Sequence, residues 1–388
     1  MPRIPALIKP DLLIWGRKTS GLNVEEAARR LKVTAATLDA WEKGREALSV
    51  AKLSEVADLY RRPLAVFFLP NPPSETQPLT DFRTAADARK STELVFQIRR
   101  AHERRDIALE LFEELDEEPP RFGTTATASA QPEIVGSRLR SLLAVTTQAQ
   151  QRWKDPRIAL NSWREAFERV GVLVFHARKI RTREARGFSI GADVLPAVVV
   201  NTKDSYAGRI FTMFHELTHV SLRKGGLCDL SNDRAIELFC NACAAAALVP
   251  RTDLLGERDV ALHSNRDSWP ADKLRSLARL YSVSEEAVMR RLVSIGKASQ
   301  HAYDEHAAIF RSRENERSDA EEKSKGGPSP AVLAVLYNGP AYTRLVLDAY
   351  KHRVIPASRV TDYLSVRFKH LEAIRENLAT PTQRRLDL

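Results

Sequence analysis

The chain has 388 residues, of which 43% are hydrophobic and 28% are charged, and its 60 Lys and Arg against 50 Asp and Glu give a net charge of +10. This length predicts about two or three globular domains, and the positive charge permits contact with nucleic acid without requiring it. Three Cys exclude a disulfide framework. No apolar run reaches the roughly 20 residues that span a bilayer, and the start of the chain does not resemble a signal peptide. We therefore expect a soluble, cytoplasmic protein that does not contact membranes.

The first predicted elements are three short helices within residues 11–70. Four apolar residues at helical spacing form one face of the leading helix: Val24, Ala27, Ala28 and Leu31. Asn23 is placed to cap this helix and Thr34 to cap the next, because short polar side chains accept hydrogen bonds from first-turn amides. Gly44 closes the second helix, and a third is predicted at 49–60. Short helices joined by a tight turn predict a helix-turn-helix.

This segment resembles the XRE/Cro-like helix-turn-helix family, and the run Trp41-Glu42-Lys43-Gly44 carries the likeness. The resemblance implies a helix-turn-helix domain over residues 1–70 in which the exposed start of the second helix reads bases. Five residues become candidates for DNA binding: Thr34, Ala35, Ala36, Thr37 and Lys43. That helix start offers no Arg, Gln or Asn for a bidentate contact with a base. Sequence-specific DNA binding and a role in docking or homodimerisation therefore both stay open.

Composition divides the rest of the chain. The predicted segments are a linker with a long helical connector (71–136), a domain of helices and strands (137–311), a flexible linker (312–330) and a C-terminal helical module (331–388). The connector holds one charged helix over 92–118, which Pro119 and Pro120 end. Two Val-rich runs, at 170–175 and 197–200, predict strands. The predicted fold class is mainly α with a small mixed β-sheet.

The strongest chemical signal lies in an apolar helix and reads Phe214-His215-Glu216-Leu217-Thr218-His219. His215 and His219 are four residues apart and therefore on one helical face, where both imidazoles can reach one ion. Zinc accepts imidazole nitrogens readily, and three protein ligands leave a position for water. Glu216 is placed to take a proton from that water and to pass it to a leaving amine. A buried helix with these residues needs polar compensation, which a metal supplies.

The third ligand is expected from the next helix, which covers residues 234–250. Glu237 and Asn241 are its conspicuous polar residues and lie four apart, on one face. Its predicted apolar face comprises Leu238, Phe239, Ala242, Ala245, Ala246 and Val249. Because a buried carboxylate is costly unless it is paired or bound to a metal, Glu237 is the predicted ligand. Asn241 is predicted to hydrogen-bond a ligand or the substrate. The alternative is a surface ion pair between Glu237 and Arg234.

These two segments resemble the ImmA/IrrE family of zinc metallopeptidases. Further likeness lies in the strand at 196–201, in Arg209-Ile210-Phe211-Thr212-Met213, in Leu248-Val249-Pro250 and in Asp81-Phe82-Arg83. The resemblance implies a zincin-like peptidase domain with one Zn²⁺ per chain, held by His215, His219 and Glu237, and Glu216 as the catalytic base. It also implies a regulatory protease that cleaves a repressor or an antitoxin. The chain departs from its relatives at Thr218, Cys240 and Cys243.

Three further residues are weaker candidates for contacts with the oxyanion or the substrate: His176, Tyr206 and Arg209. A structural role is the alternative for each. The strand at 196–201 is a candidate sheet edge to which an extended peptide could add. Cys240 and Cys243 would need Cys228 or a second pair to form a metal site, so small core residues are the preferred interpretation. The basic C-terminal helices are candidates either for recruiting a partner or for capping the peptidase domain.

A second class of function also fits the sequence, namely a DNA-binding transcriptional regulator in which the metal is structural or sensed. A structural zinc usually has four protein ligands, whereas this sequence offers three and a well-placed Glu216. That difference favours the zinc-dependent endopeptidase. Its expected partners are a protein substrate resembling a repressor or antitoxin and, through the N-terminal domain, DNA.

Overall fold

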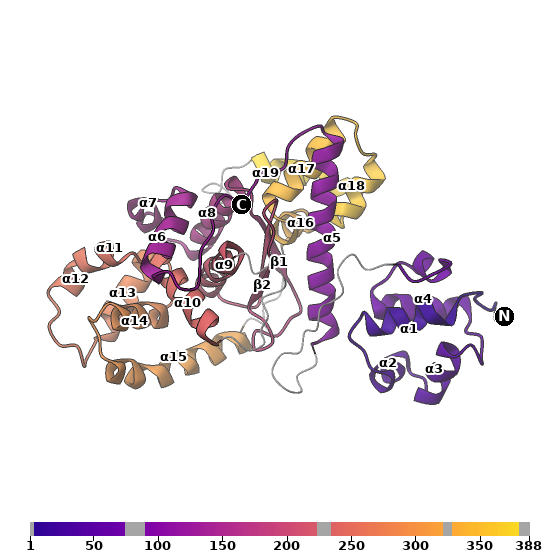
Figure 1. Cartoon of the computed structure of the whole chain (residues 1–388), viewed down its shortest axis with the longest axis horizontal. Coiled ribbons are helices and arrows are strands. Elements are labelled where there is room, and N and C mark those ends of the chain that lie inside the picture. The colour runs from indigo at the N-terminus through magenta and orange to yellow at the C-terminus, as the bar shows by residue number, and fades with distance from the viewer. Residues whose placement is uncertain (1–3, 74–89, 223–233, 321–327, 380–388) are drawn as a thin grey trace. The chain divides into compact units, whose positions relative to one another are not determined.

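A computed structural model describes residues 4–73, 90–222, 234–320 and 328–379 (Figure 1). These residues form two compact units, one up to residue 100 and the other from residue 101 onward. The segment Asp81-Phe82-Arg83 and Cys228 lie outside the described residues. No helix of the described part is long and apolar enough to cross a membrane.

The first unit is built from short helices whose starts are set by polar caps. Asn23 accepts a hydrogen bond from the Glu26 amide, and Thr34 accepts one from the Thr37 amide. The apolar faces of the helices meet in one core. The elements are α1 (Pro10–Lys18), α2 (Val24–Leu31), α3 (Ala35–Glu42), α4 (Val50–Tyr60), the 3-10 helix η1 (Leu64–Phe68) and the first part of α5 (Thr92–Glu114). Helices α2 and α3 form the predicted helix-turn-helix.

The Trp41-Glu42 pair, which carries the XRE/Cro-like resemblance, has a structural role. Trp41 and Glu42 are both buried. The Glu42 carboxylate accepts two hydrogen bonds, of 2.6 and 2.8 Å, from the Arg17 guanidinium of α1. The hydrogen bond to Glu42 raises the pKa of Arg17. A buried ion pair with both oxygens satisfied fixes α1 against α3.

The second unit contains a small mixed sheet, as the fold class predicts. Its strands are β1 (Leu173–Ala177), β2 (Gly187–Ile190) and β3 (Ala197–Asn201), in the order β1-β3-β2. Strand β3 pairs parallel with β1 and antiparallel with β2. The expectation that the 196–201 strand is a sheet edge is therefore wrong, because β3 is the central strand. Strand β2 was not predicted, since four residues with a Gly and a Ser give a weak strand pattern.

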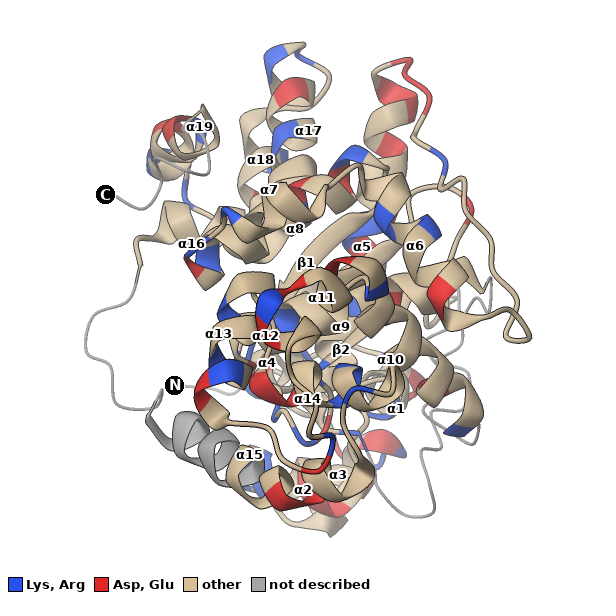
Figure 2. Ribbon diagram, turned by 90° about the vertical axis from the view of Figure 1, so that its left-hand side faces the viewer, with Lys and Arg blue, Asp and Glu red and all other residues tan. Residues whose placement is uncertain are grey.

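Helices surround this sheet and form most of the second unit. They are α6 (Pro132–Leu143), α7 (Thr147–Gln151), α8 (Pro156–Arg169), α9 (Tyr206–Ser221), α10 (Arg234–Leu248), α11 (Arg251–Gly256), α12 (Arg258–Ala261), α13 (Ala271–Tyr281), α14 (Glu285–Ser294) and α15 (Gln300–Ala320). Trp163 and Phe167 of α8 pack edge-on against Phe214 of α9. This aromatic contact fixes α9 at the centre of the apolar core. Basic and acidic residues are interspersed over the outer helices (Figure 2).

The C-terminal helices belong to the same unit as the sheet. They are α16 (Pro330–Asn338), α17 (Pro340–Lys351), α18 (Ala357–Leu364), the 3-10 helix η3 (Phe368–His370) and α19 (Leu371–Ala379). Helix α16 packs on β1, on the side of the sheet away from α11–α15 (Figure 1). The Glu168 carboxylate at the end of α8 accepts a 3.0 Å hydrogen bond from the Ala341 amide. These helices therefore cap the domain. Helix α15 continues to Ala320, past the predicted start of the flexible linker at 312.

Candidate metal centre

Helix α9 carries the predicted motif, and a polar cap fixes where the helix begins. The Ser205 hydroxyl caps the helix by accepting a hydrogen bond from the Gly208 amide. Apolar residues then bury three sides of the helix, as Ile210, Met213, Phe214 and Leu217 have no exposed surface. His219 is buried and His215 is half-buried, on the face that looks towards α10. The apolar context predicted around the motif is therefore present.

The side chains of His215, His219 and Glu237 converge on one point. The Nε2 atoms of the two His are 3.1 Å apart. Glu237 places one carboxylate oxygen 3.1 Å from His215 Nε2 and the other 3.3 Å from His219 Nε2. Ligands about 2.0–2.1 Å from a tetrahedral zinc ion lie about 3.3–3.4 Å from one another. Within the described residues these three side chains form the one group of potential ligands, and their spacing and donor chemistry fit zinc.

Asn241, one helical turn after Glu237, orients the first imidazole. Its side-chain Oδ1 lies 2.9 Å from His215 Nδ1. When Nδ1 donates its proton to this oxygen, the lone pair of His215 is on Nε2, the atom that faces Glu237 and His219. A hydrogen bond of this kind fixes the tautomer and the ring plane of a metal-binding His.

Charges and hydrogen bonds within the group shift the pKa values of Glu237 and His215 in opposite directions. Hydrogen bonds from His215 and His219 hold the pKa of Glu237 well below its usual range. Burial lowers the pKa of His215, but its hydrogen bond to Glu237 and the charge of Glu216 outweigh burial and raise it. The Glu237 carboxylate is therefore anionic and compensated by imidazoles. Among the described residues Glu237 pairs with His215 and His219 rather than with Arg234, the alternative partner.

Glu216 is held by a residue of the sheet and is not one of the three potential ligands. It is only 5% exposed, and its Oε2 accepts a 2.9 Å hydrogen bond from the hydroxyl of Ser189 on β2. Ser189 is itself buried. Sequence reasoning missed this residue, because β2 was not predicted. The available signal was a short alternating run, Gly187-Phe188-Ser189-Ile190, that leads towards the central strand.

The weaker predicted site residues lie apart from this group. His176 on β1 is buried, and burial together with the charges of Arg164 and Arg209 lowers its pKa well below the usual value. Tyr206 lies in the first turn of α9, with the Arg209 guanidinium 5.0 Å from its ring centre. His215 lies nine residues beyond Tyr206, about 13 Å along the helix axis. His176 does not belong to the group of potential ligands found among the described residues.

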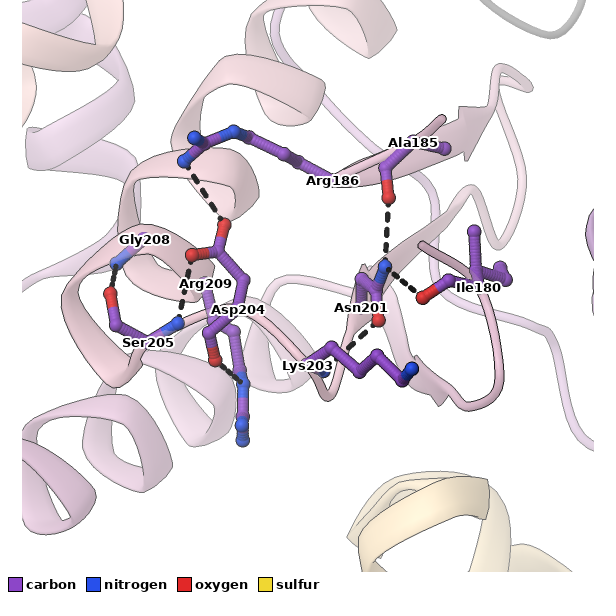
Figure 3. Close-up of polar contacts among 9 residues, drawn as sticks. All are labelled: Ile180, Ala185, Arg186, Asn201, Lys203, Asp204, Ser205, Gly208 and Arg209. Carbon is purple, nitrogen blue, oxygen red and sulfur yellow. Dashed lines mark hydrogen bonds and ion pairs between the residues drawn. The ribbon is translucent and has the colours of Figure 1, made fainter. Parts of the chain in front are cut away.

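Arg209 has a structural task at the start of α9 (Figure 3). Its Nε donates a 2.7 Å hydrogen bond to the backbone carbonyl of Asp204, and its guanidinium also donates to the carbonyl of Thr202. The Asp204 carboxylate accepts from the Ser205 amide and pairs with Arg186. The connection between β3 and α9 is therefore fixed by its own polar groups.

Helix α10 differs from the expected apolar face in one position. Leu238 is 60% exposed, whereas Phe239, Cys240 and Cys243 are buried. Burial raises the pKa of the Cys243 thiol to about 12. Since a metal-binding Cys must be a thiolate, Cys243 is a core residue, as preferred from the sequence. The exposed Leu238 lies beside Glu237 and borders the metal centre.

In the first unit, the five candidate DNA-binding residues lie on or beside α3. Thr34, Ala35 and Ala36 are exposed. The hydroxyls of Thr34 and Thr37 are 2.8 Å apart and engaged in capping the helix, and Lys43 pairs with Asp39 at 2.9 Å. The side chains at the start of α3 are therefore small, and they offer few hydrogen-bond donors to the edges of bases.

Comparisons with known protein families agree with both units. Residues 13–67 match the family model described as helix-turn-helix, and residues 167–293 match the peptidase family model described as IrrE N-terminal-like domain. The second match contains all three potential ligands and Glu216, and it supports a hydrolase of the metallopeptidase type. No curated protein and no solved structure matches the chain. The chain therefore contains a helix-turn-helix segment followed by an IrrE N-terminal-like segment, in agreement with the resemblance to the ImmA/IrrE peptidases.

Proposed function

We propose that the chain is a zinc-dependent endopeptidase with a regulatory role, in which His215, His219 and Glu237 hold the ion and Glu216 is the catalytic base. The observation that carries this proposal is the convergence of three donor atoms beside a buried carboxylate that is not itself a potential ligand. Three protein ligands leave a coordination position for water, which is the arrangement of a catalytic zinc.

Each side chain then has a defined task. When bound, zinc would polarise the scissile carbonyl and lower the pKa of a water molecule. Glu216, held by Ser189, would accept a proton from the attacking water and deliver it to the leaving amine. Asn241 would keep His215 in the tautomer that presents Nε2. Tyr206 and Arg209 receive no task in this scheme, because they lie in the first turns of α9. His176 receives none because it is buried on β1.

The substrate class follows from the two units together. A helix-turn-helix domain joined to a peptidase of this type suggests that the substrate is a transcriptional repressor or an antitoxin-like protein. The N-terminal domain would bring the enzyme to the substrate or to its DNA site. The exposed surface of α3, with Thr34, Ala35, Ala36, Thr37 and the flanking Lys43, is the proposed contact.

The second candidate function is a DNA-binding regulator whose metal is structural or sensed, which the helix-turn-helix match favours. The two functions differ in the expected role of Glu216. A structural or sensory site has no use for a buried carboxylate beside the ligands, so replacing Glu216 would leave regulation unchanged. In the peptidase the same replacement abolishes cleavage.

The deciding experiment is metal analysis by mass spectrometry of the purified wild type, His219→Ala and Glu216→Gln. We expect about one zinc per chain in the wild type and in Glu216→Gln, and loss of zinc in His219→Ala. Glu216→Gln would then serve as a trap for the protein substrate. A wild type that binds no metal even when zinc is supplied would exclude the peptidase, and DNA binding would become the leading function.

A further inference from the structure

The segment that connects β1 to β2 carries an unusual density of positive charge. Over residues 178–186, called the basic loop here, the cationic side chains are Arg178, Lys179, Arg181, Arg183 and Arg186. All five are exposed, and Glu184 is the one acidic residue of the loop. On the outer helices α11–α14, by contrast, positive and negative residues are interspersed (Figure 2).

The backbone of the basic loop is fixed from beneath by a buried side chain. Asn201, at the end of β3, is 1% exposed. Its side-chain amide donates to the carbonyl of Ile180 at 3.1 Å and to that of Ala185 at 2.9 Å (Figure 3). Its Oδ1 accepts a hydrogen bond from the Lys203 amide. One side chain therefore ties both arms of the loop to the sheet, so the cations project from a defined backbone.

The basic loop leads directly into the strand that supports the candidate base. Strand β2 begins at Gly187, and Ser189 on the same strand donates to Glu216. Arg186 lies three residues before Ser189, about 10 Å along an extended chain. Among the described residues β2 pairs with β3 alone. An extended peptide lying along the other side of β2 and across the metal centre would reach the basic loop within a few residues.

We propose that the basic loop binds acidic side chains of the protein substrate a few residues to one side of the scissile bond. This inference rests on the proposed endopeptidase function and specifies its substrate. Arg186 already pairs with Asp204. A segment of consecutive Asp or Glu fits the other cations of the cluster, because Lys179, Arg181 and Arg183 are exposed and lie within five residues of one another. A nucleic-acid backbone, by contrast, is normally bound by a longer basic stripe.

The test uses full-length, zinc-loaded Glu216→Gln and two short fluorescein-labelled peptides that differ only in four consecutive Asp or four consecutive Asn. The loop variant is Lys179→Gln, Arg181→Gln and Arg183→Gln combined, and all three side chains are exposed. The matched control removes three exposed charges elsewhere on the same unit: Arg258→Gln, Arg266→Gln and Arg279→Gln. Both triple variants have the same net charge, and far-ultraviolet circular dichroism and zinc content report their folding.

Fluorescence anisotropy should show that the Asp peptide binds at least fivefold more tightly than the Asn peptide. The loop variant should lose this preference by about five- to tenfold, because exposed ion pairs are individually weak, and added salt should weaken it. The control variant should keep it. Equal binding of the two peptides, or equal loss in both triple variants, overturns the proposal. So does tighter binding of a short oligothymidylate, which would identify a nucleic-acid surface instead.

A second arm measures specificity with the active wild type on a proteome-derived peptide library, with cleavage sites read by mass spectrometry. Asp and Glu should be enriched a few residues to one side of the cleaved bond in the wild type and in the control variant, and not in the loop variant. An unchanged profile in the loop variant contradicts the proposal. If zinc-loaded wild type cleaves no peptide at all, the proposed function fails, while the binding comparison still decides whether the basic loop takes acidic segments.

Discussion

At the scale of single residues, the candidate metal centre contains two side chains that orient others. Asn241 accepts from His215 Nδ1, and Ser189 donates to Glu216. Hydrogen bonds to a charged group contribute more than neutral ones, about 1.5–3 kcal/mol, so each bond is large enough to set an orientation. Ser189 is the more informative of the two, because it donates to Glu216, which is not one of the three potential ligands.

Replacing Ser189 with Ala should therefore lower kcat without removing the metal. We expect a loss of about tenfold or more, since the Glu216 carboxylate would no longer be held by a donor of about 1.5–3 kcal/mol. Steady-state kinetics on a cleaved peptide and zinc analysis would measure the two effects. KM and zinc content should match the wild type. A variant with normal kcat, or one that has lost zinc, would show that Ser189 does not act through Glu216.

The residue scale also shows what could be predicted from sequence. His215, Glu216, His219 and Glu237 could be proposed from the sequence because their spacing on helices is local and their chemistry is unusual in an apolar context, and the structure brings His215, His219 and Glu237 together. Ser189 was missed, because a Ser on a short strand becomes significant only when the fold brings it to a helix. His176 was a weaker candidate because it is a lone His at the end of a predicted strand, and in the structure it is buried on β1.

At the scale of elements, close packing of two helices positions the third potential ligand. Gly136 of α6 faces α10, and a Cβ atom at this position would lie 2.7 Å from the Cβ of Ala246 and 2.7 Å from the carbonyl oxygen of Cys243. Both of those contacts belong to the helix that carries Glu237. The absence of a side chain at Gly136 therefore sets how near α10 can lie to α6.

Gly136→Ala should push the two helices apart and destabilise the second unit by about 1–3 kcal/mol, the usual cost of overpacking. Urea unfolding followed by fluorescence would report the change, and zinc affinity should fall in parallel. Gly123→Ala is the matched control, because a Cβ at Gly123 meets nothing within 4 Å. Equal stabilities of the two variants would contradict this account of the α6–α10 contact.

A buried carboxylate links α8 to the C-terminal helices and predicts a dependence on pH. Burial raises the pKa of Glu168 from its usual 4.5 to about 7, against the charges of Arg164 and Arg344. Because the folded chain binds the proton more tightly than the unfolded chain, this stabilisation is complete below pH 4.5 and is lost as the pH rises to about 7. At about 1.4 kcal/mol per pKa unit, the loss is about 3 kcal/mol.

Glu168→Gln should abolish this dependence, since an amide does not titrate and can still accept from the Ala341 amide. The measurement is the difference in the free energy of unfolding between wild type and variant, taken with chelator from pH 4.5 to pH 8. His176 titrates in the opposite sense, but it is common to both chains and cancels in the difference. A difference that does not change with pH would disprove the role of Glu168.

The element scale also explains why the position of β3 in the sheet was predicted wrongly. The helical caps at Asn23 and Thr34 are local signals, and they were predicted correctly. Strand order is a property of pairing between distant segments, so the sequence of β3 could not show that β1 and β2 flank it on both sides. An all-buried strand such as β3 is nevertheless typical of a central position.

At the scale of the whole molecule, the potential ligands and Glu216 all belong to the second unit. A ligand that binds only the folded state stabilises it by mass action, by about 2.7 kcal/mol when its free concentration is 100 times Kd. Metal removal should therefore act on one unit and leave the other unchanged.

Scanning calorimetry should show two transitions, of which the one from the second unit shifts down by several degrees when a chelator removes zinc. The other transition should stay in place. His219→Ala provides the control, because its second transition should already be low and insensitive to the chelator. If both transitions move together, or if neither moves, the metal does not stabilise the second unit separately.

The anchoring of the basic loop has a consequence for how specificity can diverge. Asn201 recognises backbone carbonyls, at Ile180 and Ala185, and every residue type supplies a carbonyl. The side chains of Arg181, Thr182 and Arg183 can therefore be exchanged without disturbing the anchor or β2. Grafting an acidic or an apolar sequence into these three positions should redirect the proposed peptidase towards different partners, while the potential ligands and Glu216 stay in place.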